Sequence, residues 1–277
     1  MSNTAVKSNL PLDRDIKSAW ILSFICAVLM GVLSLFGLLF PESIYKTEVL
    51  IQSYFTNDIV NLVLGLPILL GSMWLTNRGK LVGLLFWPGA LLYIIYNYIA
   101  VVFGRPFDIF TFAYLALILI SAYSIYDLIR KIDSNSVKQQ LAGAVAEKLA
   151  GWFLLIFGIL FFLRAATILV GARLNQAVLP LTEIGVSIAD IVISILWIIG
   201  GIMLIRIKPL GYIAGLGLLF AASMLFVGLI IILIIQPVLT TAPFSPIDII
   251  VVALMGLILS IPFFLFLRGT IKASHIE

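Results

Sequence analysis

The chain has 277 residues, of which 62% are hydrophobic and only 11% are charged, and its mean hydropathy is +1.21. A soluble domain carries about 25% charged residues, so this composition excludes an ordinary soluble globular protein. The net charge of +4 indicates no nucleic-acid partner, because the basic residues follow a membrane pattern described below.

Eight segments are apolar for long enough to cross a bilayer as helices, which takes about 20 residues each. Backbone polar groups inside hydrocarbon have no water to bond, so each segment has to satisfy them within a helix. We therefore predict an all-α, polytopic membrane helix bundle. In chain order, the predicted spans are Ala19–Phe40, Asp58–Thr76, Leu81–Phe103, Phe107–Ile129, Leu149–Gly171, Gly185–Ile205, Leu210–Ile235 and Ile247–Leu267.

Basic residues cluster in the polar segments on one side of these spans. Thirteen of the 17 lysines and arginines lie in the N-terminal segment or in later connections on the same side, while the other connections hold Lys46, Arg105 and Arg173. By the positive-inside rule, this bias predicts a multi-pass protein of the plasma (inner) membrane with both termini in the cytoplasm. The run Ala19–Phe40 lacks a small-residue cleavage site, so we expect an uncleaved first span.

The second and sixth predicted spans contain the same tripeptide, Asp58-Ile59-Val60 and Asp190-Ile191-Val192. Each leads through a short basic turn into the next span, so we interpret the tripeptides as equivalent positions of two hairpins. Four spans per half give both halves the same orientation, which predicts two parallel four-helix repeats about an axis along the membrane normal. The predicted parts are a cytoplasmic tail (1–18), a first half (19–133), a cytoplasmic linker helix (134–148) and a second half with a short tail (149–277).

The linker has the pattern of an amphipathic helix. Ser136 and Gln139 have the spacing of a capping box, which predicts a helix start at Ser136. Apolar residues then recur every four positions from Val137 to Leu149. We therefore expect a helix that lies on the membrane surface and continues into the fifth span.

Arg164 is the sharpest functional candidate because it lies within the fifth predicted span. An arginine at the centre of a spanning helix costs about 2.5–3.5 kcal/mol, so a partner is expected. Asp190 on the next span and Glu183 just outside it are acids on the same side. Arg164 could line an outward-facing polar cavity, where it binds an anionic group or gates against Asp190. Alternatively, it forms a purely structural pair with Asp190 or extends to the outer interface.

Each even-numbered predicted span begins near an aspartate, where a carboxylate caps the first amides of a helix. Capping accounts for Asp58, Asp108, Asp190 and Asp248 without a ligand, whereas the alternative is a cation or proton entry on the outer face. In that alternative, polar side chains of neighbouring spans would act as further ligands. The candidate polar pocket consists of Arg164, Asp190, Glu183, Asp58, Asn61, Tyr93, Tyr96 and Asn97.

The stretch that contains Gly65-Leu66-Pro67, Gly79-Lys80 and Trp87-Pro88-Gly89 up to Tyr98 resembles an uncharacterised family of prokaryotic polytopic integral membrane proteins. The resemblance covers roughly the second to fourth predicted spans and rests on short aromatic and glycine patterns. It implies an integral membrane protein. It assigns no site residue, because that family has no assigned function.

The sequence carries no motif for catalysis or cofactor binding. His275 is the only histidine and lies in the tail, Cys26 is the only cysteine and lies in the first span, and no predicted span contains a lysine. Histidine-held haem or metal, an intramolecular disulfide and a retinal Schiff base are therefore excluded within one chain. We expect no enzyme, no cofactor and no metal site, and we expect Cys26 to be a small buried residue.

These patterns favour a small-solute or ion transporter, or a membrane-embedded binding subunit, with a pocket between the halves for a small anionic or cationic ligand. The alternative is a non-catalytic assembly or sensor protein that acts through a partner. Gly211 and Gly215 form a small-residue surface of the kind that helices use for close contact. In this alternative, a protein partner or a second copy of the chain would dock on the Gly211/Gly215 face.

Overall fold

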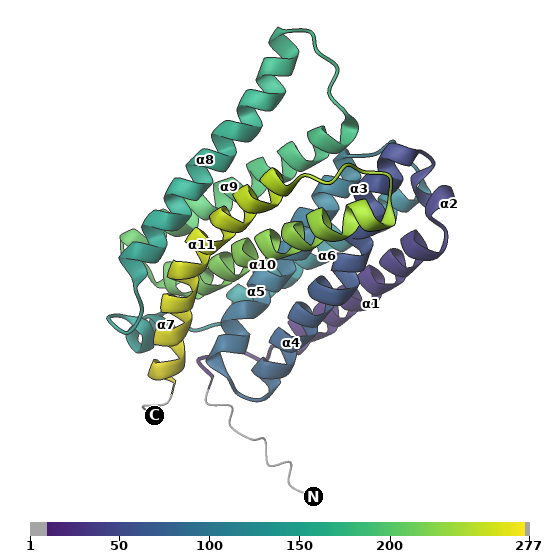
Figure 1. Ribbon diagram of the computed structural model, residues 1–277. Helices are drawn as coiled ribbons and strands as arrows, with labels where there is room; N and C mark the ends of the chain where they lie inside the picture. Colours follow the sequence, from purple (N-terminus) through teal and green to yellow (C-terminus); the bar gives the residue numbers. More distant parts are fainter. Residues whose placement is uncertain (1–9, 275–277) are drawn as a thin grey trace, which may run out of the picture.

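The computed structural model describes residues 10–274, so the predicted tail up to residue 9 and His275 lie outside the described part (Figure 1). Within it the chain is a bundle of helices without strands, and eight helices are long and apolar enough to cross a membrane. The predicted all-α bundle is therefore confirmed, and the chain is a polytopic membrane protein. The elements are α1 (Lys17–Leu39), α2 (Pro41–Tyr45), α3 (Glu48–Val60), η1 (Asn61–Gly65), α4 (Leu66–Asn77), α5 (Leu81–Phe103), α6 (Ile109–Ile129), α7 (Ser134–Leu141), α8 (Glu147–Leu174), α9 (Leu181–Ile205), α10 (Pro209–Leu239) and α11 (Pro246–Ala273).

The first span, α1, begins and the last span, α11, ends at the same end of the bundle, which we call the terminal end (Figure 1). The opposite end, which we call the distal end, holds the connections 40–47, 104–108, 175–180 and 240–245. At the terminal end, the backbone of Leu12 pairs with that of Ile132. This pairing fixes the segment before α1 to the connection after α6.

The central helix is α5, which has 89% of its spanning stretch buried, against 22% for the peripheral α8. It lies beside α10 in the middle of the bundle (Figure 1). The two helices touch backbone to backbone, because a Cβ atom on Gly89 would lie 2.2 Å from the carbonyl oxygen of Gly217. These two glycines therefore set the distance between α5 and α10.

The hairpins α4–α5 and α9–α10 close with the same backbone turn. Gly79 in the first turn and Ile207 in the second have left-handed backbones, with φ of 71° and 54°. The next amide, of Lys80 or Lys208, donates to the carbonyl oxygen five residues earlier, at 3.0 and 2.9 Å. A left-handed backbone suits the glycine of the first turn but strains a β-branched residue such as Ile207. The second turn therefore has the geometry of the first although its own residue does not favour it.

The matched turns correct one expectation from the sequence. When Arg78 is aligned with Arg206, Asp58 lies four residues farther from its turn than Asp190 does, which is about one turn of helix. The two Asp-Ile-Val tripeptides therefore do not occupy equivalent places, although the turns that follow them match.

The second span starts earlier than predicted. One continuous helix runs through α3, η1 and α4 (48–77), and Thr47 caps it by accepting a backbone amide. Hydropathy missed its first turns because they are polar and lie at the distal end, outside the apolar stretch. In η1, a single π-helical turn, the amide of Leu66 bonds to the carbonyl oxygen of Asn61. This wider turn accommodates Pro67, which has no amide to donate.

The linker helix is shorter than predicted and does not continue into the fifth span. α7 is capped by Asp133 rather than Ser136, and Gly143, with φ of 78°, lies in the break before α8 begins at Glu147. Hydrogen bonds from the hydroxyl and amide of Ser136 hold the pKa of Asp133 below its ordinary value. The apolar face of α7 packs against α10 and α11, so this helix is a cover for the terminal end of the second half.

The capping interpretation holds for Asp108 but is wrong for Asp58 and Asp190. Asp108 caps α6 by accepting two backbone amides, at 3.0 and 3.2 Å, within a capping box. Asp248 lies in the first turn of α11, where Ser245 is the cap. Asp58 and Asp190 lie inside α3 and α9 and are buried, so their carboxylates need partners other than helix amides.

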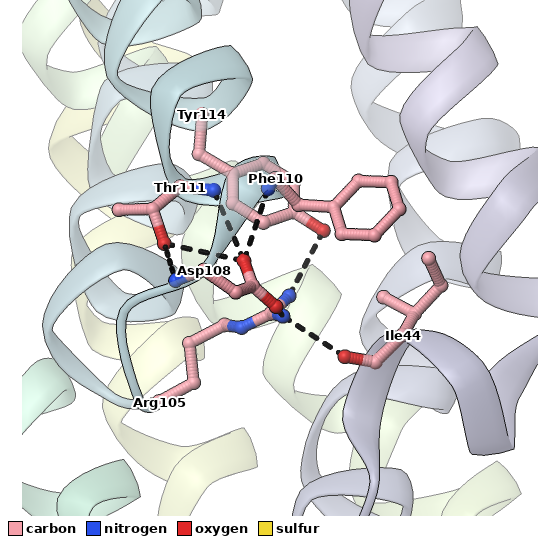
Figure 2. Close-up of polar contacts among 6 residues, drawn as sticks. All are labelled: Ile44, Arg105, Asp108, Phe110, Thr111 and Tyr114. Carbon is pink, nitrogen blue, oxygen red and sulfur yellow. Dashed lines mark hydrogen bonds and ion pairs between the residues drawn. The ribbon is translucent and has the colours of Figure 1, made fainter.

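Arg105 ties three distal segments together (Figure 2). Its guanidinium forms an ion pair with Asp108, donates to the backbone oxygen of Ile44 at 2.9 Å and donates to the hydroxyl of Tyr114 at 3.2 Å. Arg105 is buried, so these partners replace water at its two terminal nitrogens, whereas its Nε has no partner in the described residues. The pair joins α2 to the start of α6 and leaves no net charge at this point.

We expect Gly89→Ala to lower the free energy of unfolding by about 1–3 kcal/mol, because the new methyl group would overlap the backbone of α10. Gly71→Ala is the matched control, since Gly71 lies in α4 with nothing within 4 Å of its added Cβ. Thermal unfolding in detergent measures both variants. Equal midpoints for the two would contradict the close contact between α5 and α10.

Candidate functional site

A cavity of about 720 Å³ lies between α5, α10 and α11 on one side and the α8–α9 hairpin on the other, with α3 at its edge. Tyr93 and Trp197 line it as buried residues, whereas Glu183 and Asp248 line it as exposed residues near the distal end. The cavity therefore has a buried floor and an exposed rim that belongs to the distal end. Its volume is within the range of small-molecule sites, about 300–1,000 Å³.

An ion pair with one buried member forms the cavity wall. The guanidinium Nη1 of Arg164 donates to Asp190 Oδ2 at 2.9 Å, and the hydroxyl of Tyr96 donates to Asp190 Oδ1 at 2.8 Å. The side chain of Asp190 is 3% exposed, whereas that of Arg164 is 57% exposed. Asp190 is therefore held from two helices, and Arg164 keeps much of its surface open to other partners.

Aromatic rings form the floor of the cavity, and one of them has an N–H group without a hydrogen-bond partner. Phe161 meets Trp197 edge to face with ring centroids 5.6 Å apart, and it meets Phe226 in the same way at 6.0 Å. The indole N–H of Trp197 is buried and has no hydrogen-bond partner in the described part of the chain. Trp197 therefore contributes the surface of its ring to the cavity, while its indole N–H is closed off from it.

The cavity carries excess negative charge. Arg164 and Asp190 neutralise each other, while Glu183 and Asp248 at the rim form no ion pair with any described lysine or arginine. Walls of low dielectric focus such a field and raise the local concentration of cations. The rim therefore favours positively charged solutes.

The structure brings six of the eight predicted pocket residues together around one cavity: Arg164, Asp190, Glu183, Tyr93, Tyr96 and Asn97. Asp58 and Asn61 do not line it. Asp58 points away from the cavity, to α1 and α2, although its neighbour Asn57 is part of the cavity wall. The expectation of a single pocket is wrong for these two residues, because helical periodicity groups residues on a face without saying which neighbour that face meets.

Sequence reasoning missed the aromatic floor. Trp197 lies seven residues after Asp190 and on the same helix face, which was a usable signal. The sequence around Phe161 and Phe226 does not indicate a cavity, because an aromatic residue in a spanning helix can also face lipid. Their role depends on the packing of α8 against α9 and α10.

The fold and the cavity together define a polytopic α-helical membrane protein with a partly polar chamber that opens at one end of the bundle. No family model, curated protein or solved structure matches the chain. The resemblance to an uncharacterised family of prokaryotic membrane proteins therefore stays a prediction. The roles of the cavity residues rest on their own geometry.

We expect Arg164→Ala to destabilise the fold by about 1–2 kcal/mol, because it leaves the buried Asp190 without its counter-charge. This lies below the 3–5 kcal/mol of fully buried pairs because Arg164 is more than half exposed. Adding Asp190→Asn should recover part of that loss, since the remaining side chain is neutral. Chemical unfolding of both single variants and the double variant measures the coupling, and strictly additive losses would contradict the pair.

Proposed function

We propose that the chain binds a small solute in the cavity, as a transporter or as a membrane-embedded binding subunit. The observation that carries this proposal is the chamber that joins the pair of Arg164 and Asp190 to an aromatic floor that includes Trp197. Keeping charged and polar groups at membrane depth is costly, and such groups usually mark a solute path or a binding site. A purely structural bundle would have no need for a chamber of this size.

The preferred solute is a small organic molecule that carries both an ammonium group and a hydrogen-bond acceptor. The acidic rim attracts positive charge, and the faces of tyrosine and tryptophan rings bind ammonium groups. The acceptor would bond the exposed side of the Arg164 guanidinium. A solute with only negative charge would meet the repulsion of Glu183 and Asp248.

The proposal includes the orientation and the two-half organisation. Thirteen of the 17 basic residues lie on the side of the terminal end, which supports cytoplasmic termini in a plasma membrane and a cavity open to the outside. The matched turns of the α4–α5 and α9–α10 hairpins support two parallel halves. α5 and α10 then occupy equivalent places on either side of the axis.

A partner role through the glycine face has less support. Gly211 and Gly215 are buried against Met203 and Leu204 of α9 in the same chain. The expected docking face for a protein partner or a second copy is therefore already covered. The solute-binding role requires no such partner.

The binding test compares three solutes of similar shape: betaine, tetramethylammonium and pivalate. We expect betaine, a zwitterion with an ammonium group and a carboxylate acceptor, to raise the thermal midpoint most. Tetramethylammonium, which has the ammonium group alone, should raise it less, and pivalate, which has the carboxylate alone, should not raise it. The double variant Glu183→Gln, Asp248→Asn should weaken betaine binding roughly tenfold through the loss of two attractive charges.

Glu42→Gln is the matched control, because Glu42 is an exposed acid at the distal end that does not line the cavity. This variant should bind betaine as the unmodified protein does. Stabilisation by pivalate alone, or by none of the three solutes, would contradict the proposed class of ligand.

A further inference from the structure

A second polar group lies on the other side of α3 from the cavity, and we call it the Asp58 cluster: Ser34 of α1, Tyr45 of α2, Asp58 of α3 and Tyr98 of α5. All four are buried, and Asp58 is only 6% exposed. The hydroxyl of Tyr45 donates to Asp58 Oδ2. The hydroxyl of Ser34 lies between this carboxyl group and the hydroxyl of Tyr98, yet neither hydroxyl has a partner of hydrogen-bond geometry in the described residues.

No positive charge is left over to neutralise Asp58. Its titratable neighbours are Tyr45, which contacts it, and Tyr98 of α5 and Tyr114 of α6. The charged groups facing it come from the turn before α6, where Arg105 is already paired with Asp108 (Figure 2). The residues of α1 next to Asp58 are Ser34 and Gly37, and neither carries a charge. An ionised Asp58 would therefore leave one uncompensated charge in an apolar interior, which is strongly unfavourable.

The packing around the carboxyl group decides what neutralises it. A Cβ atom on Gly37 would lie 1.9 Å from Asp58 Oδ2 and 2.6 Å from the hydroxyl of Tyr45. Within residues 10–274, no cluster of three acids, cysteines or histidines exists that would hold a metal ion. One crowded carboxyl group with hydroxyl neighbours lacks the six to eight oxygen ligands that a calcium-like ion needs. A proton needs no space of its own, and it gives the acid a donor for a neighbouring hydroxyl.

We propose that Asp58 is a proton-binding site, closed and neutral in this conformation. Release requires α3 to move away from α1, which lets water reach the carboxyl group. The O–H bond of the acid then breaks, the proton passes to water, and the carboxylate keeps the electron pair. The π-helical turn η1 begins three residues after Asp58 and is followed by Pro67, so the helix has a natural bending point next to the site.

The site is placed to respond to the cavity. α3 contributes Ser53, Tyr54 and Asn57 to the cavity wall, while the adjacent Asp58 faces the cluster. A solute that contacts the cavity face of α3 and shifts this helix would therefore disturb the packing on its other face. This coupling rests on the proposed solute binding, whereas the protonation of Asp58 does not.

Infrared spectroscopy of the purified protein tests the protonation without any solute. At neutral pH we expect the carbonyl band of a protonated carboxylic acid, shifted in D₂O, which disappears in Asp58→Asn. Asp190→Asn should keep this band, because Asp190 is paired with Arg164. Tyr45→Phe should keep the band but shift it, because it removes one hydrogen bond to the acid; this variant serves as the test if Asp58→Asn does not fold.

Two results would overturn the proposal. The first is a folded protein without a protonated-acid band at neutral pH, which would show an ionised Asp58. The second is a band that sodium chloride removes and potassium chloride does not, which would show a sodium site instead. Failure of betaine to bind would leave the infrared result unaffected, so the two proposals fail separately.

Discussion

The backbone contact between α5 and α10 is the constraint on which the rest of the structure depends. Gly89 and Gly217 allow these helices to touch, and Gly151 and Gly201 do the same for α8 and α9 in their terminal halves. Farther toward the distal end, α5 carries the bulky Tyr93 and its neighbours in place of glycine. At the distal end, α5 meets α9 closely, because a Cβ atom on Gly185 would lie 2.2 Å from the carbonyl oxygen of Ala100. The cavity lies among these contacts, between α5, α10 and α11 on one side and the α8–α9 hairpin on the other.

The two buried aspartates, Asp58 and Asp190, serve different purposes because their surroundings differ. Asp190 has an arginine and a tyrosine as donors, so it can be buried with its charge matched. Asp58 has hydroxyl groups but no arginine of its own, since Arg105 belongs to Asp108. In a membrane protein, this difference in partners makes Asp190 part of an ionic cavity wall and Asp58 the centre of a closed cluster that holds a proton.

The sequence predicted the bundle well because spanning helices are defined by apolar length, a property of the chain alone. The span Leu81–Phe103 agrees with α5 at both ends. Where polar helix extends beyond the apolar stretch, as before Asp58, hydropathy has no signal and capping residues such as Thr47 decide the boundary. The linker helix was predicted, but its end was placed too late, because the left-handed backbone at Gly143 outweighs the apolar pattern around it.

The candidate site was only partly predictable. Spacing placed Tyr93, Tyr96 and Asn97 on one face of their helix, and the structure shows that this face meets the cavity. Spacing could not show that Asp58 faces α1, because that depends on how α3 is rotated within the bundle. The aromatic floor depends in the same way on tertiary packing, which no local pattern in α8 or α10 records.

If the cavity and the Asp58 cluster are as described, α3 separates a chamber that water can enter from a closed polar cluster. Cysteine accessibility in a Cys26→Ala background tests it most directly, because the native cysteine is buried and is removed. Vesicles carrying Asn97→Cys, Thr182→Cys or Ser34→Cys are treated from each side with a small, charged thiol reagent. The account predicts that Asn97→Cys and Thr182→Cys react from the same single side and that Ser34→Cys reacts from neither. Protection of Asn97→Cys from both sides, or ready labelling of Ser34→Cys, would contradict it.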